Sequence, residues 1–181
     1  MEILDGRSEI DFAGRTVITL GKFDGLHLGH KELIGKTAVH PDNQKSVVFT
    51  FSYDSKFIYR EPQLLSNDVR RKMIESMNVD YLVEFPLMDK EAEMSPEDFI
   101  SQILVGRFHV AKIIAGKDVS FGYMGRGDEK LLRQLGEKYD YEVMIIKKIE
   151  YDGSEISSSR IRAALAEGKK EAAYAMLGHD L

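Results

Sequence analysis

Two of the chain's five histidines stand three residues apart in the segment GKFDGLHLGH, residues 21–30. Residues at this spacing lie on one side of a helical turn, with about 5–6 Å between their Cβ atoms. A helix that begins here presents unpaired N–H groups and a positive dipole end, which together favour an anion. Imidazoles can donate hydrogen bonds to phosphate oxygens, and a phosphate favours their charged form. His27 and His30 therefore predict a phosphate site.

The glycines of the same segment support this interpretation. Gly21 and Gly25 allow a sharp turn and a close approach between the backbone and a ligand. Two other interpretations remain open from the segment alone. The histidines could be a metal pair, although the spacing supplies no third ligand, or they could be exposed loop residues without a function.

A second segment with phosphate-binding chemistry is EISSSRIRAAL, residues 155–165. Ser157, Ser158 and Ser159 are residue types that cap helices, and their hydroxyl and N–H groups can hold phosphate oxygens. Arg162 can contact a phosphate through two parallel hydrogen bonds. The alternative is a plain serine cap followed by surface arginines. Two helix starts of this kind in one chain favour a phosphate site built from both.

The elements that would position these residues alternate along the chain. Short apolar runs predict strands at 16–20, 46–51, 80–85, 111–116 and 141–149. Helical periodicity and cap residues predict helices at about 27–37, 66–77, 95–104, 128–139 and 158–177, the last with a break at Gly168. This alternation predicts an α/β fold: one Rossmann-like domain, 1–181, with a doubly wound parallel sheet of about five strands and helices on both faces. Ligands of such sheets bind at the carboxyl ends of strands, where both histidines and serines fall.

Composition excludes several classes of function. The net charge of −5 argues against a duplex nucleic-acid partner, which needs a clustered basic face. The chain contains no cysteine, so disulfides and thiolate chemistry are excluded. No apolar run approaches the ~18 residues of a membrane span, and the acidic N-terminus is unlike a signal peptide. We therefore expect a cytoplasmic protein with no membrane partner; the sequence does not indicate its oligomeric state.

Four segments together carry a family resemblance. HLGH and ISSSRIR resemble the paired signatures of the nucleotidyltransferase superfamily that has a His-x-Gly-His motif. The Phe-Asp-Gly before the first histidine is similar to one branch, the FMN adenylyltransferase module of bacterial FAD synthetase. The segments FTFS at 49–52 and GKDVSFGYMGRGD at 116–128 resemble that module's flavin-side segments. The resemblance extends over nearly the whole chain, but the chain ends before the family's riboflavin kinase module.

The resemblance implies that FMN attacks the α-phosphorus of ATP with Mg²⁺ present, giving FAD and pyrophosphate without a covalent protein intermediate. It implies catalytic roles for His27, His30 and Arg162. The ATP-binding residues that it implies are Gly21, Phe23, Asp24, Gly25, His27, His30, Asp118, Ser158, Ser159 and Arg162. The FMN-binding residues that it implies are Thr50, Phe51, Tyr53, Phe121, Gly122 and Arg126. Asp118 is also implied beside Mg²⁺ carried by the ATP phosphates.

Some residues depart from the family pattern on the flavin side. The segment TFSYDSK replaces a proline-rich segment, and Val119 and Ser120 replace an aromatic residue and an arginine. Two alternatives therefore stay open. One is a nucleotidyltransferase with another phosphorylated acceptor, such as nicotinamide mononucleotide, phosphopantetheine or glycerol phosphate. The other is a flavin- or nucleotide-binding regulatory protein without turnover. We expect no riboflavin kinase activity, and we interpret Lys147 and Lys148 as part of a solvated face.

Overall fold

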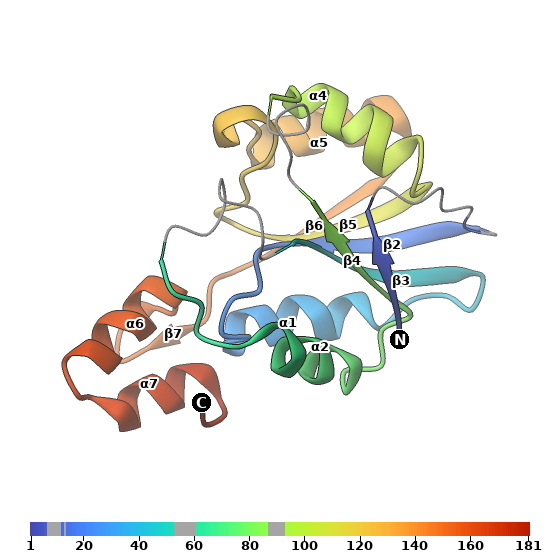
Figure 1. The fold of residues 1–181 in the computed structure, drawn as a ribbon. Coiled ribbons are helices and arrows are strands. Elements are labelled where there is room, and N and C mark those ends of the chain that lie inside the picture. Colours follow the sequence, from blue (N-terminus) through green and yellow to red (C-terminus); the bar gives the residue numbers. More distant parts are fainter. Residues whose placement is uncertain (7–11, 13, 53–60, 87–92) are drawn as a thin grey trace.

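The computed structural model describes residues 1–6, 12, 14–52, 61–86 and 93–181, and all strands of its main sheet run parallel. In spatial order the strands are β1 (Glu2–Asp5), β4 (Tyr81–Phe85), β3 (Gln44–Phe51), β2 (Arg15–Leu20), β5 (Val110–Gly116) and β6 (Glu142–Ile146) (Figure 1). The predicted α/β class and parallel sheet are confirmed. The described sheet has six strands rather than about five, because the short segment Glu2–Asp5 adds an edge strand beside β4.

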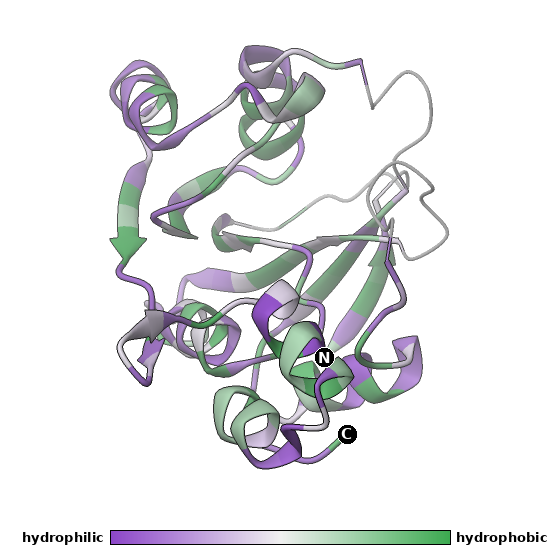
Figure 2. Cartoon of the chain, turned by 90° about the vertical axis from the view of Figure 1, so that its left-hand side faces the viewer, coloured by the Kyte–Doolittle hydropathy of each residue, from purple (hydrophilic) through white to green (hydrophobic). Residues whose placement is uncertain are grey.

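Side chains alternate between two apolar layers along each central strand. Ile18 and Val47 belong to one buried cluster, whereas Val17 and Val48 belong to the other. The first cluster includes side chains of η1 (Phe99–Val105), which continues from the short α4 (Pro96–Asp98), and of α5 (Glu129–Tyr139). The second includes side chains of α1 (Leu28–Thr37) and α2 (Asn67–Glu75). Helices therefore cover both faces, as predicted, and Figure 2 shows the mainly hydrophobic strands between the two helical layers.

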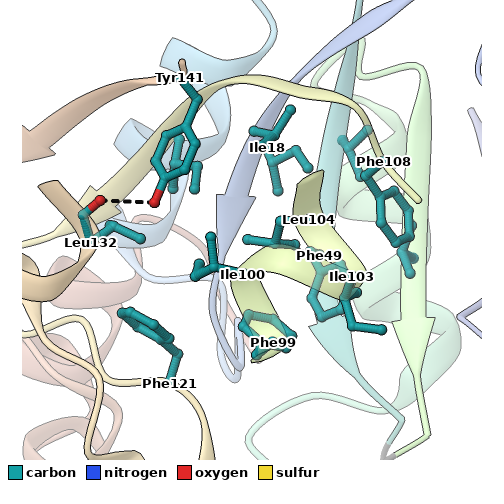
Figure 3. Packing of buried hydrophobic residues seen from close by; sticks show 14 of the residues in the cluster. Ile18, Phe49, Phe99, Ile100, Ile103, Leu104, Phe108, Phe121, Leu132 and Tyr141 are labelled. Atoms are coloured by element: carbon teal, nitrogen blue, oxygen red, sulfur yellow. Dashed lines mark hydrogen bonds between the residues drawn. The ribbon is translucent and has the colours of Figure 1, made fainter. Parts of the chain in front are cut away.

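Aromatic packing joins the layer of η1 to the sheet. The Phe49 ring lies 5.7 Å from the Phe99 ring and 5.6 Å from the Phe108 ring, both edge-on (Figure 3). The Tyr141 hydroxyl donates a 2.8 Å hydrogen bond to the Leu132 carbonyl and so fastens α5 to the start of β6. This packing fixes the strand ends that carry the site.

The segment predicted as one α-helix at 95–104 has mostly π-helical geometry. Ser95 caps its start, since its hydroxyl accepts the Asp98 N–H at 3.0 Å, and Pro96 occupies the first turn. Beyond Asp98 the pattern widens, and the Gly106 N–H bonds the Ser101 carbonyl five residues earlier. π-Helical turns are frequent beside functional sites, and this one begins at Phe99.

The C-terminal part packs against the loop that carries the histidines. It contains the hairpin strands β7 (Glu150–Tyr151) and β8 (Ser154–Glu155), then α6 (Ser158–Ala166) and α7 (Lys170–Leu177). The predicted break is confirmed at Gly168, whose φ is +75°. His179 contacts the Gly25 carbonyl through Nε2 at 3.0 Å, so the end of the chain touches the histidine loop. Within the described ranges no helix is both long and apolar enough to cross a membrane.

Candidate functional site

A cavity of about 970 Å³ opens at the carboxyl end of the sheet. The residues that line it include Leu20 at the end of β2 and Gly21 directly after it, together with the last residues of three other strands: Phe51 of β3, Gly116 of β5 and Ile146 of β6. The chain leaves β2 toward β3 on one side, whereas β5 pairs on the other side of β2. Such a reversal of strand order creates the crevice where α/β sheets bind ligands.

His27 and His30 lie together in this cavity. His27 caps α1, because its Nδ1 accepts the backbone N–H of His30 at 3.4 Å. The two rings stack with 3.6 Å between centroids and 18° between planes. As an acceptor, Nδ1 of His27 leaves the ring proton on Nε2, which can donate to a ligand.

Burial keeps both imidazoles uncharged. Loss of solvent lowers the pKa of His27 to about 4, although the nearby Asp118 carboxylate acts in the opposite direction. Loss of solvent, with a smaller effect of His27, holds the pKa of His30 well below 6.5. The close stacking is compatible with two neutral rings, because two imidazolium ions at this distance would repel. Nδ1 of His30 is buried and has no hydrogen-bond partner among the described residues.

The loop between β2 and α1 has unusual backbone geometry. Phe23 and Leu26 are fully buried yet have φ of +51° and +39°, a region that bulky residues rarely adopt. Gly25 has φ of +78°, and a Cβ there would lie 2.7 Å from Leu64 Cδ1. Strained backbone of this kind clusters at active sites and ligand clamps. The Phe23 ring packs edge-on to the His30 ring at 5.3 Å and so supports it from below.

Asp24 connects this loop to α6. Its buried carboxylate accepts the Leu64 N–H at 2.8 Å and pairs with the Arg162 guanidinium. Its carbonyl accepts the Ser158 hydroxyl at 2.8 Å. Arg162 also pairs with Glu61 at 3.1 Å. The described lining of the cavity does not include Asp24, Gly25 or Arg162. The Arg162 guanidinium is paired with the carboxylates of Asp24 and Glu61.

The serine segment forms the start of α6 as predicted. Ser157 is the cap residue, because its hydroxyl accepts the Arg160 N–H at 3.2 Å. Ser157 and Ser158 line the cavity near the histidines, whereas Ser159 does not. The cavity therefore meets the N-terminal ends of two helices, α1 and α6, which is suitable for a polyphosphate.

The carboxylate of Asp118 and the ammonium group of Lys148 form an ion pair at the lining of the same cavity. Lys148 Nζ lies 3.1 Å from Asp118 Oδ2 and 2.8 Å from Glu155 Oε2. The hydrogen bond with Glu155 is the main cause of a raised pKa of Lys148, with burial acting against it. Interpreting Lys148 as part of a solvated face was therefore wrong: it is half-buried and lines the cavity.

The described residues contain no cluster of three side chains that could hold a metal by themselves. Asp118 offers a single exposed carboxylate at the lining of the cavity. Mg²⁺ is often bound by one or two carboxylates together with substrate phosphates, so the residues present fit a metal that enters on a polyphosphate.

The opposite end of the cavity is apolar and aromatic. The side chains that line it are Leu20, Phe49, Phe51, Phe85, Met94, Phe99, Val119 and Phe121. Among the residues predicted for the flavin side, Phe51, Phe121 and Gly122 line the cavity. Thr50 is buried and donates to the Lys22 carbonyl at 3.2 Å, while the exposed Arg126 lies over the Tyr123 ring. Tyr53 lies outside the described residues.

Sequence reasoning missed part of this lining. Phe85 and Phe99 were interpreted only as parts of a strand and a helix, and Lys148 was not connected with Asp118. The alternation in FTF, residues 49–51, places Phe49 and Phe51 on one side of β3 and was a usable signal. The approach of Lys148 to Asp118 depends on how the segment after β6 crosses the end of β5, which no local pattern specifies.

Comparison with known proteins places this geometry in context. A family model described as FAD synthetase matches residues 10–160. A FAD synthetase of Listeria monocytogenes is 31% identical over 170 residues, covering 90% of this chain and 68% of that protein. A bifunctional riboflavin kinase/FMN adenylyltransferase of Buchnera aphidicola is 31% identical over 192 residues, covering 98% of this chain and 59% of that protein. The chain thus spans about three fifths to two thirds of the length of these relatives.

Solved structures share the fold. A crystal structure described as a macrolide-efflux protein from Streptococcus pneumoniae superposes with a TM-score of 0.81 at 27% identity, covering 98% of this chain and 61% of that chain. A pantoate-β-alanine ligase from Francisella tularensis superposes with a TM-score of 0.60 at 15% identity, covering 95% of this chain and 77% of that chain. At that identity the second likeness concerns the fold alone.

Proposed function

The chain belongs to the FAD synthetase family, and from this premise we propose that it transfers AMP from ATP to the phosphate of FMN. The observation that carries the proposal is a single cavity with two chemically different ends. One end has two histidines and two helix N-termini, and the other has an aromatic lining. The first end suits a triphosphate and the second suits the flat isoalloxazine ring of a flavin.

In the proposed reaction, an oxygen of the FMN phosphate attacks the α-phosphorus of ATP. The new P–O bond replaces the bond between the α-phosphorus and the oxygen shared with the β-phosphorus. The electron pair of that bond leaves on pyrophosphate, and the product is FAD. The protein acts by positioning the two phosphates and stabilising the charge that develops between them.

The proposed roles at the phosphate end follow from the hydrogen-bond pattern. His27 donates from Nε2 because its Nδ1 is engaged by the backbone of His30. His30 contributes a second donor from the stacked ring. The N–H groups at the starts of α1 and α6 bind further phosphate oxygens. Asp118 would hold Mg²⁺ that accompanies the nucleotide, and this ion would neutralise phosphate charge when bound.

The further implied residues support the phosphate end indirectly. Asp24 fastens the start of α6 to the histidine loop through Ser158 and Arg162. Arg162 reaches a phosphate only after a change in its contacts with Asp24 and Glu61. We propose that ATP draws the arginine toward the β- and γ-phosphates, because a polyphosphate offers it a higher negative charge than a carboxylate.

The acceptor is tested by measuring pyrophosphate release from ATP and Mg²⁺ with one candidate acceptor at a time. FMN is compared with nicotinamide mononucleotide, phosphopantetheine and glycerol phosphate, and FAD is followed by chromatography. The proposal expects release with FMN alone, accompanied by an equal amount of FAD. Release with another acceptor and not with FMN would contradict it, as would tight flavin binding with no release.

A further inference from the structure

One cationic side chain at the phosphate end is unused by the proposed chemistry. Lys148 follows β6 and reaches across the end of β5, where its ammonium group contacts Asp118. We infer that Lys148 is a phosphate-binding residue of the nucleotide site, an inference that rests on the proposed function and names a further residue of the same site. It would act beside His27, from a part of the chain outside both sequence motifs.

Charge supplies the first argument. The two histidines are neutral in the ligand-free protein, because burial lowers the pKa of each. Arg162 does not line the cavity and is engaged by Asp24 and Glu61. Among the described lining residues the cationic side chains are Lys22, Lys147 and Lys148. In the described lining, positive charge for a triphosphate therefore comes from these lysines.

Position separates Lys148 from the other two. Lys22 and Lys147 are exposed, whereas Lys148 is half-buried. Its ammonium group pairs with the carboxylates of Asp118 and Glu155. Asp118, its partner, is close enough to His27 to influence the pKa of that imidazole. The ammonium group thus lies at the histidine end of the cavity and not at the aromatic end.

Hydrogen-bond capacity supplies the third argument. An ammonium group has three N–H donors. Asp118 and Glu155 use two of them, at 3.1 and 2.8 Å. The described residues provide no partner for the third, which leaves one charge-assisted donor for a phosphate oxygen. The two carboxylates also restrain a flexible side chain, so that less entropy is lost when a ligand binds.

The test compares equilibrium binding of ATP with Mg²⁺, measured by calorimetry without any acceptor, in the wild type and in Lys148→Met. Loss of one charge-assisted contact should raise the Kd for ATP about tenfold. The Kd for FMN should stay within about twofold, and Lys148→Arg should recover most of the ATP affinity. Lys148→Gln is a second neutral variant that retains hydrogen-bonding capacity.

Lys112→Met is the matched control. Lys112 has similar exposure, 29% against 26% for Lys148, and it also pairs with a carboxylate, that of Glu142 at 3.3 Å. It lines a separate cavity near Arg15 and Asp140, so its loss should leave ATP binding unchanged.

Two results would overturn the inference. One is wild-type ATP affinity in both neutral variants. The other is an equal loss of ATP and FMN affinity together with a lowered Tm, which would indicate a purely structural role. Because ATP binding is read without an acceptor, wild-type protein that binds ATP but forms no FAD contradicts the proposed acceptor and not the role of Lys148.

Discussion

At the scale of single residues, the histidine pair combines a structural role at the start of α1 with the absence of charge on both rings. His27 completes the start of α1 through Nδ1, so its orientation is fixed by the helix that it caps. The same burial that orients the rings removes their charge, and the stack of 3.6 Å depends on that neutrality. With its Nδ1 engaged as an acceptor, neutral His27 has its Nε2–H group as the donor that the proposed function assigns to a phosphate oxygen.

The lowered pKa of His27 predicts a pH effect on stability. Its pKa is about 4 in the folded protein and 6.5 in an unfolded chain. Between these values only the unfolded chain binds the proton, so this group reduces the free energy of unfolding as pH falls below 6.5. Replacement by glutamine removes the effect. Between pH 7 and pH 5 the wild type should lose about 2 kcal/mol more than His27→Gln does.

Urea unfolding of both proteins at the two pH values measures this difference. The comparison cancels the carboxylates that titrate in both proteins. Parallel loss of stability in wild type and variant would show that the His27 pKa is not lowered in the folded state.

At the scale of elements, the site depends on how α6 is joined to the loop between β2 and α1. Asp24 connects the two through an ion pair with Arg162 and a hydrogen bond from the Ser158 hydroxyl, and it also accepts the Leu64 N–H. The hairpin β7–β8 directly precedes α6, whose first turn lines the cavity. Phe99 of η1, in the helical layer on the other face of the sheet, also lines it. Elements distant in sequence thus form one cavity wall.

Asp24→Asn should weaken this connection. The Asp24 side chain is 5% exposed, and removing one partner of a buried ion pair leaves the other charge poorly compensated. We expect the free energy of unfolding to fall by about 3 kcal/mol, with a loss of adenylyl transfer as α6 shifts. Glu61→Gln is the control: it removes an ion pair of the same arginine, but from a side chain that is 60% exposed, so the cost should stay below about 1 kcal/mol. Equal costs in urea unfolding would contradict the role given to Asp24.

Gly122 positions the loop at the aromatic end. It has φ of +70°, and a Cβ there would lie 2.5 Å from the backbone of Pro96 at the start of α4. Gly153 has the same φ of +70° in the β7–β8 turn, with no atom within 4 Å of its Cβ position. Gly153→Ala should therefore cost only about 1 kcal/mol of backbone strain, whereas Gly122→Ala should cost more and raise the KM for FMN. Identical Tm and KM values in the two variants would contradict this account.

At the scale of the whole molecule, local patterns predicted the parallel sheet and two segments, those of the histidines and the serines, that line one cavity. The alternation of strands and helices and the serines at helix starts are local signals. In the structure, Ser66, Ser95 and Ser157 cap α2, α4 and α6. The edge strand Glu2–Asp5 was missed because four residues with a single buried or half-buried position show no periodicity. The ion pair between Arg162 and Asp24 could not be predicted, because it joins residues that are 138 positions apart in the sequence.

The phosphate of the acceptor is the group that the proposed reaction requires. An oxygen of this phosphate attacks the α-phosphorus of ATP in that reaction. Riboflavin lacks the phosphate that must attack ATP, so it should yield no FAD. Riboflavin is therefore the matched negative acceptor for the central measurement.

That central measurement is the fate of the ATP phosphates during turnover with FMN. With ATP labelled at the α-phosphate, the account predicts label in FAD and none in pyrophosphate. With ATP labelled at the γ-phosphate, it predicts label in pyrophosphate and none in the flavin product. Label from the γ-phosphate in a flavin product, or no labelled FAD from α-labelled ATP, would contradict adenylyl transfer at this cavity.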